Sequence, residues 1–425
     1  MPAVRAFVTA EPCAPPALSA FDNSLSAFDN SEAAAANRDS ASAIVVERAD
    51  GKRLSEIEAD WRELVGRALE PNVFMHPAIA QITTRYFPRR RCTTLLAWRR
   101  DGNKPRLVGL LTFSVGTPPH SPLPLRVLNV PPLPHSYLAT PVVDRDFADG
   151  AIDALLDFIA QESSLPKIVA FDPIRSDGPV VQALARVIGA RNGALAFLRE
   201  SARPMLASDL DGKQYLEQAL SGSSRKKLRQ CRRRLEQKGS LATKIWDTPE
   251  TVTRAFDDFL ALEMAGWKGR AGTALDCNAA EAAFAKDMIA ALAGRGEASI
   301  HALTLQDKPV SMQIVLRSGP IAFTWKTAYD ETLGDFSPGM LLLEDYTKAL
   351  LADDGITAVD SCAYDDSGFM AAWRERQAIA QLWIDVRRGG SLSFPAMTRT
   401  HQTWLKLRTA AKHIYLARRR LWKRH

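Results

Sequence analysis

The sequence "IAFTWKTAYD" (residues 321–330) is followed, four residues later, by "DFSPGMLLLED" (residues 335–345). The first segment is apolar and aromatic, as buried strands are, and the second opens a helical run with Ser, Pro and Gly. A helix that begins here leaves its first N–H groups unpaired, and Pro338 removes no donor that the helix needs. Gly339 lets a ligand approach the backbone closely. Ser-Pro-Gly also starts many helices that bind nothing, but a strand–turn–helix junction of this kind can hold a phosphate.

The residues of this predicted phosphate site are Phe336, Ser337, Pro338, Gly339, Met340 and Leu341.

Apolar periodicity around the junction predicts the same order of elements twice. Residues 299–330 indicate a three-stranded meander, and the junction helix (340–355) follows it. A strand, a helix and a strand are then predicted at 356–363, 369–376 and 378–386. The first half shows a hairpin through residues 101–103, then helix, strand, helix and strand at 151–163, 167–174, 179–191 and 194–200.

Two α/β domains in tandem, with mixed sheets flanked by helices, explain this repetition most simply. Residues 1–43 are rich in Ala, Ser and Asn, which predicts a disordered tail. The expected parts are this tail, an N-terminal domain (44–205), a C-terminal domain (206–390) and a basic amphipathic helix (391–425).

The composition is that of a globular protein, with 46% hydrophobic and 24% charged residues. No apolar stretch approaches the roughly 18–20 residues of a membrane span, and the N-terminus has no apolar core of a signal peptide. The five cysteines are scattered without CxxC spacing, and the seven histidines show no HxH or HExxH spacing. We therefore expect a cytoplasmic protein with reduced thiols, no metal site and no metal cofactor.

The net charge of +7 is concentrated in two segments. Residues 222–239 carry eight Lys/Arg and one Glu, and residues 401–425 carry eight Lys/Arg and no acid. In the first segment Leu228, Cys231 and Leu235 form a narrow apolar stripe at helical spacing, which would hold the bases outward. A solvated helix face and an anion-binding surface both fit; we favour an anionic partner, with Arg225 as a substrate-binding candidate. No aromatic residue interleaves with these bases, which disfavours nucleic acid.

A glycine-rich stretch, "EMAGWKGRAGTAL" (263–275), predicts a flexible loop. It is either a surface connection or the wall of an acceptor site. In the second case Trp267 would be an apolar platform, and Lys268 or Arg270 would meet an anion.

The ordered segments "SRKKLRQCRRRLEQKG", "GWKGRAGTAL", "YDETLGDFSPGMLLLEDYTKAL" and "VDSCA…FMAAWRER" resemble the CelD-type GNAT acyltransferases. This family is associated with bacterial cellulose biosynthesis and is structurally related to the FemAB-type aminoacyl transferases. The likeness covers about residues 205–386.

The resemblance implies a tandem GNAT fold in which acyl-CoA lies across the strand ending near Tyr329, with its pyrophosphate at Ser337–Leu341. It implies transfer of an acyl group to an amine or hydroxyl of a small acceptor of envelope or exopolysaccharide metabolism. The usual GNAT phosphate loop, with its spaced glycine pair, is absent, and Gly339 stands almost alone. An aminoacyl-tRNA donor, as in the FemAB relatives, and a non-catalytic scaffold in a polysaccharide-synthesis complex are the alternatives.

A thioester is already activated, so positioning and a strand N–H for the oxyanion could supply much of the catalysis. The candidates for a catalytic side chain on the predicted sheet are Asp360, Tyr329, His301 and Asp330. Asp360 ranks first because it ends an apolar strand, whereas the lone His301 fits a structural role better than a catalytic one. Lys326 lies within the strand and is a candidate contact to acceptor or cofactor.

The C-terminal segment "HQTWLKLRTAAKHIYLARRRLWKRH" (401–425) places Trp404, Leu407, Ile414 and Leu421 on one rough helical face. Such a basic amphipathic segment can lie on an anionic membrane surface, peripheral to the inner membrane, or dock on a partner protein. Docking on its own chain fits the pattern equally well.

Overall fold

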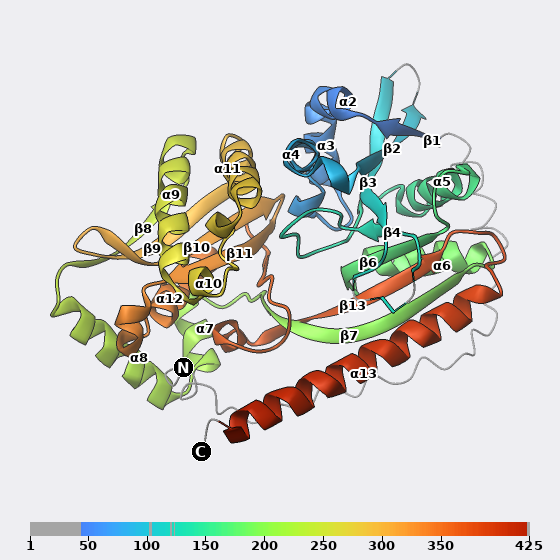
Figure 1. The fold of residues 1–425 in the computed structure, drawn as a ribbon. Coiled ribbons are helices and arrows are strands. Elements are labelled where there is room, and N and C mark those ends of the chain that lie inside the picture. Colours follow the sequence, from blue (N-terminus) through green and yellow to red (C-terminus); the bar gives the residue numbers. More distant parts are fainter. Residues whose placement is uncertain (1–43, 102–103, 120, 123, 423–425) are drawn as a thin grey trace.

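The computed structural model describes residues 44–422 except 102–103, 120 and 123, and the side chains of these residues up to 411, apart from that of residue 101. The predicted tail (1–43) and the tip of the predicted hairpin (102–103) lie outside the described residues. The chain forms one mixed sheet with helices packed on its faces (Figure 1), which confirms the predicted mixed α/β fold class.

The N-terminal half runs from β1 to α6. Its strands are β1 (Ile44–Ala49), β2 (Cys92–Asp101), β3 (Lys104–Gly116), β4 (Val127–Val130), β5 (Val142–Val143) and β6 (Ile168–Arg175). Its helices are α2 (Gly51–Glu56), α3 (Glu58–Arg67), α4 (Pro77–Tyr86), α5 (Ala148–Gln161) and α6 (Pro179–Ala190), with the 3₁₀ turns η2 (Val73–Met75) and η3 (Pro88–Arg90).

The C-terminal half runs from α7 to β12. Its strands are β8 (Leu241–Trp246), β9 (Ala298–Leu305), β10 (Lys308–Ser318), β11 (Ile321–Tyr329) and β12 (Ala358–Asp360). Its helices are α7 (Gly212–Ala219), α8 (Gly222–Glu236), α9 (Pro249–Ala265), α10 (Trp267–Arg270), α11 (Ala279–Ala293) and α12 (Pro338–Leu351), with η4 (Leu275–Cys277) and η5 (Glu331–Phe336). The turn η6 (Phe369–Ala372) and α13 (Ser393–Trp422) follow.

Two long strands, β7 (Ala194–Leu206) and β13 (Glu375–Asp385), join the halves at the centre of the sheet (Figure 1). The strand order is β1-β2-β3-β4-β6-β13-β7-β12-β11-β10-β9-β8, and β5 pairs with β3. β7 follows the N-terminal half but pairs with β12, whereas β13 ends the chain's strands but pairs with β6. The C-terminal half is therefore extended by β7, which follows the N-terminal half in the chain, and the N-terminal half is extended by β13, which follows the C-terminal half. Because β7 and β13 pair with each other, the sheet runs without interruption through both halves.

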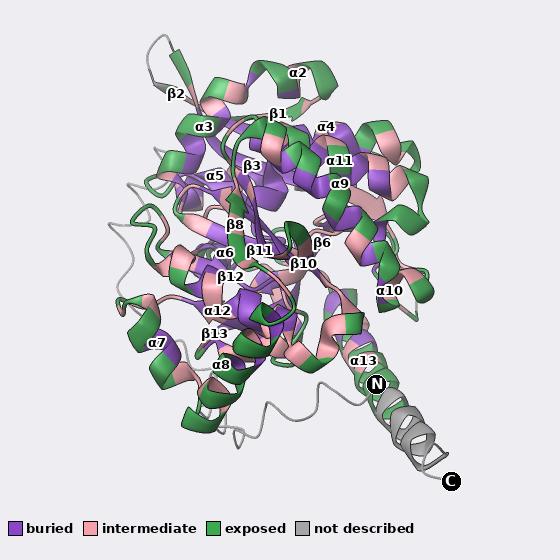
Figure 2. Cartoon of the chain, turned by 90° about the vertical axis from the view of Figure 1, so that its left-hand side faces the viewer, coloured by how far each residue is buried: buried purple, intermediate pink, exposed green. Residues whose placement is uncertain are grey.

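Each half keeps the same arrangement of strands. β4 is parallel to β6, and β11 is parallel to β12, while the other neighbouring strands are antiparallel. Helices α9 and α11 bury one face of the C-terminal sheet, and α7, α8 and α12 bury the other. In Figure 2 the buried residues accordingly follow the sheet and the inner faces of these helices. Among the described residues, no helix combines the length and apolarity needed to cross a bilayer.

Two predicted elements are wrong. The helix expected at 369–376 is only the turn η6, and β13 starts at Glu375, where it pairs with Met205 of β7. The loop expected at 263–275 contains the end of α9 and the one-turn helix α10. A Cβ on Gly269 would lie 1.9 Å from the Met264 carbonyl oxygen, so glycine is required for α10 to fold back against α9.

Candidate active site

The candidate site begins where β11 extends beyond its neighbour β12. Only Ile321, Ala322 and Phe323 of β11 pair with β12, whereas the pairing with β10 continues to Tyr329. The register between β10 and β11 shifts at Ile314/Val315, which marks a β-bulge opposite the start of this unpaired edge. No strand of the described chain pairs with the edge of β11 from Thr324 onward, so the backbone N–H groups on this edge have no strand partner.

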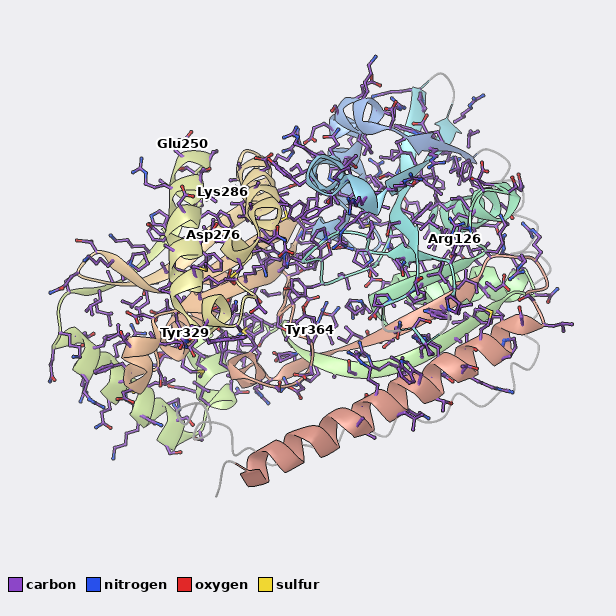
Figure 3. The ribbon with its side chains drawn as sticks, viewed as in Figure 1. Arg126, Glu250, Asp276, Lys286, Tyr329 and Tyr364 are labelled. Carbon is purple, nitrogen blue, oxygen red and sulfur yellow. The ribbon has the colours of Figure 1, made fainter. Side chains whose placement is uncertain are left out.

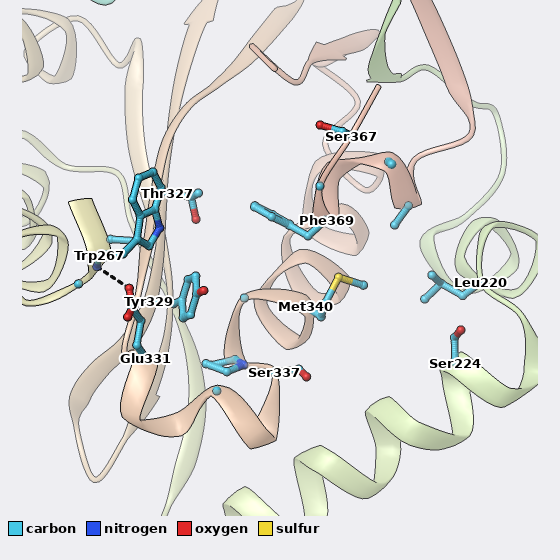
Figure 4. Close-up of a pocket in the computed structure, with 18 of the residues that line it drawn as sticks. Leu220, Ser224, Trp267, Thr327, Tyr329, Glu331, Ser337, Met340, Ser367 and Phe369 are labelled. Carbon is cyan, nitrogen blue, oxygen red and sulfur yellow. Dashed lines mark hydrogen bonds between the residues drawn. The ribbon is translucent and has the colours of Figure 1, made fainter. Parts of the chain in front are cut away.

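A cavity of about 820 Å³ adjoins this edge (Figure 4). Its walls come from the α7–α8 junction, the α9–α10 segment, β11, the η5–α12 junction and the loop 366–372. Seven of the sequence-predicted site residues line it: Trp267, Lys268, Tyr329, Ser337, Pro338, Gly339 and Met340. The structure thus brings together the glycine-rich stretch and the strand–helix junction, which lie about 70 residues apart in the sequence.

The N-terminus of α12 opens into the cavity. Its N-cap residue, Ser337, has a left-handed backbone (φ 50°, ψ 52°), and its side chain makes no capping hydrogen bond. The N–H groups of Met340 and Leu341 donate to the Ser337 carbonyl at 3.0 and 3.1 Å. Within the described chain the Gly339 N–H has no acceptor, and a Cβ on Gly339 would come no closer than 3.9 Å to Tyr329 Cδ1. One unpaired amide and open space are therefore present at this helix end.

The other residues of the predicted phosphate site point elsewhere. Leu341 is fully buried in the core between α12 and the sheet. The Phe336 ring packs under the cations of Arg234 and Lys238 at 5.0 and 5.2 Å, and it does not line the cavity. The site at this junction is accordingly narrower than the predicted residues 336–341.

A second helix N-terminus, that of α8, reaches the same cavity. Ser221 caps α8 and accepts from the Ser224 N–H at 3.1 Å, and both residues line the cavity together with Ser223. Arg225, which was predicted to bind substrate, instead lies 3.7 Å from Glu217 and outside the lining. Two helix N-termini, each with a positive end of its dipole, thus face one cavity. The serines were missed because the basic run dominates this segment.

The segment around α10 forms a wall that two carboxylates fasten to β11. Glu263, which is only 2% exposed, accepts from Lys268 Nζ at 2.8 Å and from the Leu275 N–H at 2.9 Å. Lys268 Nζ also donates to the Thr327 carbonyl at 2.9 Å. Glu331 accepts from the Trp267 N–H and from Arg270, both at 2.5 Å. Neither glutamate was predicted, because their sequence neighbourhoods do not reveal these partners.

Tyr329, at the end of β11 (Figures 3 and 4), is the predicted catalytic residue that reaches the cavity. Burial, with a smaller contribution from the Glu331 charge, raises the pKa of its hydroxyl. The phenol therefore keeps its proton at neutral pH and can donate it. Lys326 does not line the cavity; burial lowers the pKa of its ammonium group to about 8, despite the nearby Glu263.

Asp360 and His301 do not line the cavity, so we do not retain them as candidate bases. Asp360 is buried in an ion pair with Arg203 of β7 and accepts from the Cys362 N–H at 2.8 Å. His301 lies in β9 with its ring 6.2 Å from that of Tyr346, and burial lowers its pKa to about 4. Asp330 accepts from the Thr332 N–H at 2.9 Å in a local turn. Among the described residues, no group of three or more His, Cys, Asp or Glu side chains could hold a metal ion.

Comparisons with known proteins concern the domain family and the fold. Residues 222–369 match the family model described as an acetyltransferase (GNAT) domain. No curated protein matches the chain as a relative. Among solved structures, FemX is similar at 12% identity with a TM-score of 0.51, over 80% of this chain and 96% of that one.

Two more distant structures are a tandem GNAT protein from the clavulanic acid pathway and the C-terminal domain of a protein described as a lysylphosphatidylglycerol synthetase from Agrobacterium fabrum. The first has 14% identity and a TM-score of 0.39 over 80% of this chain and 98% of that one. The second has 13% identity and a TM-score of 0.48 over 83% and 97%. The identities are low enough that only the fold is compared. Residues 222–369 are therefore similar to the acetyltransferase (GNAT) domain family, within a mixed α/β fold like that of FemX, and the CelD-type resemblance stays a prediction.

Proposed function

We propose that the protein is an acyltransferase that moves an acetyl or other acyl group from acyl-CoA to an amine or hydroxyl of a small acceptor. One observation carries the proposal: the unpaired edge of β11 and the open N-terminus of α12 face the same cavity. The match of residues 222–369 to a GNAT domain supports this class of reaction. The choice of an envelope or exopolysaccharide acceptor follows from the CelD-type resemblance alone.

The residues present fit such a donor. The Gly339 N–H and the N-terminus of α8 would hold the pyrophosphate, since both helix ends favour anions. The wall of the cavity is largely apolar, which suits the acyl chain and the uncharged arm of the donor. This apolar wall includes Leu220, Leu262, Met340 and Phe369. The donor would supply an activated thioester, so the protein has to position it and stabilise developing charge.

Backbone N–H groups and one side chain of β11 suit the chemistry at the thioester carbonyl of the donor. Lys268 reaches the Thr327 carbonyl, which shows that this carbonyl faces the open edge. Because alternate residues of an antiparallel strand direct their N–H and C=O groups to the same side, the N–H groups of Thr327 and Tyr329 face that edge too. Either could donate to the thioester oxygen as it becomes negative. The Tyr329 hydroxyl would give its proton to the departing sulfur as the acceptor bonds to the carbonyl carbon.

No carboxylate lining the cavity is unpaired in the described chain. Glu263 is bound to Lys268, Glu331 to Arg270, and Asp366 to Arg376 at 2.8 Å. We therefore expect the acceptor proton to leave through water rather than through a dedicated carboxylate base.

Calorimetric titration with acetyl-CoA tests the donor. The unchanged chain should bind with micromolar affinity, and Gly339→Asp should weaken binding by at least about tenfold, since a carboxylate at this helix end repels phosphate. The variant should fold, because the position has room and an acid near a helix N-terminus is favourable. Gly66→Asp is the matched control: Gly66 lies in α3, and a Cβ there would meet nothing within 4 Å. Equal affinity of Gly339→Asp and the unchanged chain would contradict the proposed site.

A charged tRNA is the second candidate donor, and the exposed basic face of α8 beside the cavity favours it. Lys226, Arg229 and Arg233 are all exposed on that face. This donor would be supported if the protein bound aminoacyl-tRNA with an affinity that falls steeply with salt. The double variant Lys226→Glu with Arg229→Glu should then abolish the binding. A folded chain that binds neither acetyl-CoA nor aminoacyl-tRNA would leave the non-catalytic scaffold.

A further inference from the structure

Helix α13 consists of a docked part and an exposed part. In the docked part Phe394, Thr398 and His401 are buried at helical spacing, and the His401 ring lies 4.7 Å from the Trp383 ring of β13. Gln402 Nε2 donates to the Phe197 carbonyl of β7 at 2.7 Å. These contacts fix the first three turns of α13 along β7 and β13 (Figure 1).

From Lys406 to Ala411 every residue of α13 is exposed. Leu405 packs against the cluster beneath α13, and the helix bounds extend about 17 residues further, to Trp422, or roughly 25 Å at 1.5 Å per residue. In Figure 2 the exposed turns of α13, drawn in green, lie beyond its buried first turns and away from the sheet. Residues 406–411 are thus not covered by the rest of the described fold, so contact with an external surface can stabilise this part of the helix.

The exposed side chains at the start of this part and just before it are both apolar and basic. Trp404 is 41% and Leu407 60% exposed, and they lie three residues apart on one face. Lys406 and Arg408 flank them, and no carboxylate among the described residues lies within ion-pair distance of either base. In the sequence the same pattern continues, with eight bases and no acid over residues 401–425.

We propose that α13 docks the protein on an anionic phospholipid surface. A tryptophan and a leucine flanked by bases suit the headgroup region, where the aromatic ring and the aliphatic chain enter the interface and the bases meet lipid phosphates. Because the segment carries bases and no acids, its charge is complementary to a uniformly negative lipid surface. A surface that binds a protein partner usually carries charges of both signs. The docking does not depend on the acyl-transfer chemistry proposed above.

Vesicle co-flotation of the full chain without acyl donor tests this docking. Vesicles of phosphatidylcholine alone should leave the protein unbound, and vesicles with about one-third phosphatidylglycerol should carry it up. Each base near an anionic surface raises affinity roughly fivefold, so Lys406→Glu with Arg408→Glu should lower it by more than about tenfold. Lys52→Glu with Arg62→Glu is the matched control, with the same charge change on the 87% and 73% exposed side chains of α2 and α3, which lie on the opposite side of the molecule from α13.

A second variant tests the apolar contact. Leu407→Ser should weaken vesicle binding by roughly tenfold without changing the melting temperature, because Leu407 is exposed. The blue shift of tryptophan fluorescence on vesicle addition should be largely lost in Trp404→Phe. The proposal would be overturned if the protein did not bind anionic vesicles, or if Lys406→Glu/Arg408→Glu bound them as well as the control variant does. It would also be overturned if the protein self-associated without lipid and these variants abolished that self-association, because α13 would then be a contact between copies of the chain.

Discussion

The two halves of the molecule place an equivalent helix after an equivalent strand, but only one of these helix ends is open. In the N-terminal half α5 follows β4 and β5 and leads into β6, as α12 follows β11 and leads into β12. A hollow lies at each helix N-terminus, of about 380 Å³ at α5 and about 820 Å³ at α12. The first turn of α5 carries Asp149, whereas the first turn of α12 carries no acid.

An acid in the first turn of α5 offsets the positive end of that helix dipole, whereas the carboxylates that line the larger cavity lie outside the first turn of α12. Asp149 pairs with Arg186 at 2.7 Å, and Asp146 also lines the smaller hollow. The strands differ as well: β4 ends at Val130, its last residue paired with β6, so no unpaired edge comparable to that of β11 remains. A repeated fold therefore does not imply a repeated site. What differs is whether the helix amides and the strand edge are left available.

The largest expected effect tests whether the two halves form one unit. Arg203 of β7 pairs with Asp360 of β12 and donates to the Tyr137 carbonyl of the N-terminal half at 2.8 Å. Arg203→Ala leaves a buried carboxylate unpaired and should lower the free energy of unfolding by about 3–5 kcal/mol, in a single urea transition. A loss below 1 kcal/mol, or two separate transitions, would show that the halves are independent.

A pH titration probes the C-terminal sheet. The pKa of His301 is lowered from about 6.5 to about 4, so between these values the unfolded chain binds more protons. The stability that the neutral, buried His301 side chain contributes is complete above pH 6.5. It decreases as the pH falls towards 4, and the free energy of unfolding drops by up to about 3 kcal/mol in all. His301→Gln should flatten that part of the urea-midpoint profile. An unchanged slope in the variant would assign the acid sensitivity to other groups.

The strand ends differ in their last side chain, Val130 in β4 and Tyr329 in β11. Tyr329→Phe removes the proposed proton donor and should lower the turnover of acetyl-CoA with amino-sugar acceptors about a hundredfold. Its dissociation constant for acetyl-CoA should stay within about threefold of the unchanged chain's, because only the hydroxyl is removed. Tyr86→Phe, which removes a hydroxyl that donates to Asp287 of α11 at 2.8 Å and lies outside the cavity lining, is the control. Full turnover in Tyr329→Phe would exclude the role.

The smallest effect is expected at the closed helix end. Asp149→Asn should lower the free energy of unfolding by only about 0.5–1 kcal/mol, since it weakens one partly exposed ion pair and one favourable dipole contact. It should not create a second binding site for acetyl-CoA, because β4 offers no open edge. A second equivalent of acetyl-CoA bound by this variant would mean that helix electrostatics alone distinguish the halves.

Local patterns predicted the strand–helix junction well. The apolar run 321–330 and the Ser-Pro-Gly start are β11 and α12, separated by the turn η5. The helix expected at 369–376 failed because pairing between β13 and β7 outweighs the helical preference of "FMAAWRER". The place of Asp360 at a strand end predicts a catalytic base, but its ion-pair partner Arg203 lies 157 residues earlier in the sequence, beyond the reach of local patterns.

The sequence by itself determined the elements whose causes are local: most of the strands and helices, the Ser-Pro-Gly turn before α12, and the two basic segments. Spacing and capping act over a few residues, so they can be read directly. Only the tertiary structure decided the exchange of β7 and β13, the short pairing of β12 that leaves β11 open, and the fastening of α10 by Glu263 and Glu331. These features depend on contacts between residues far apart in the chain, and whether a helix end stays available depends on what such contacts bring beside it.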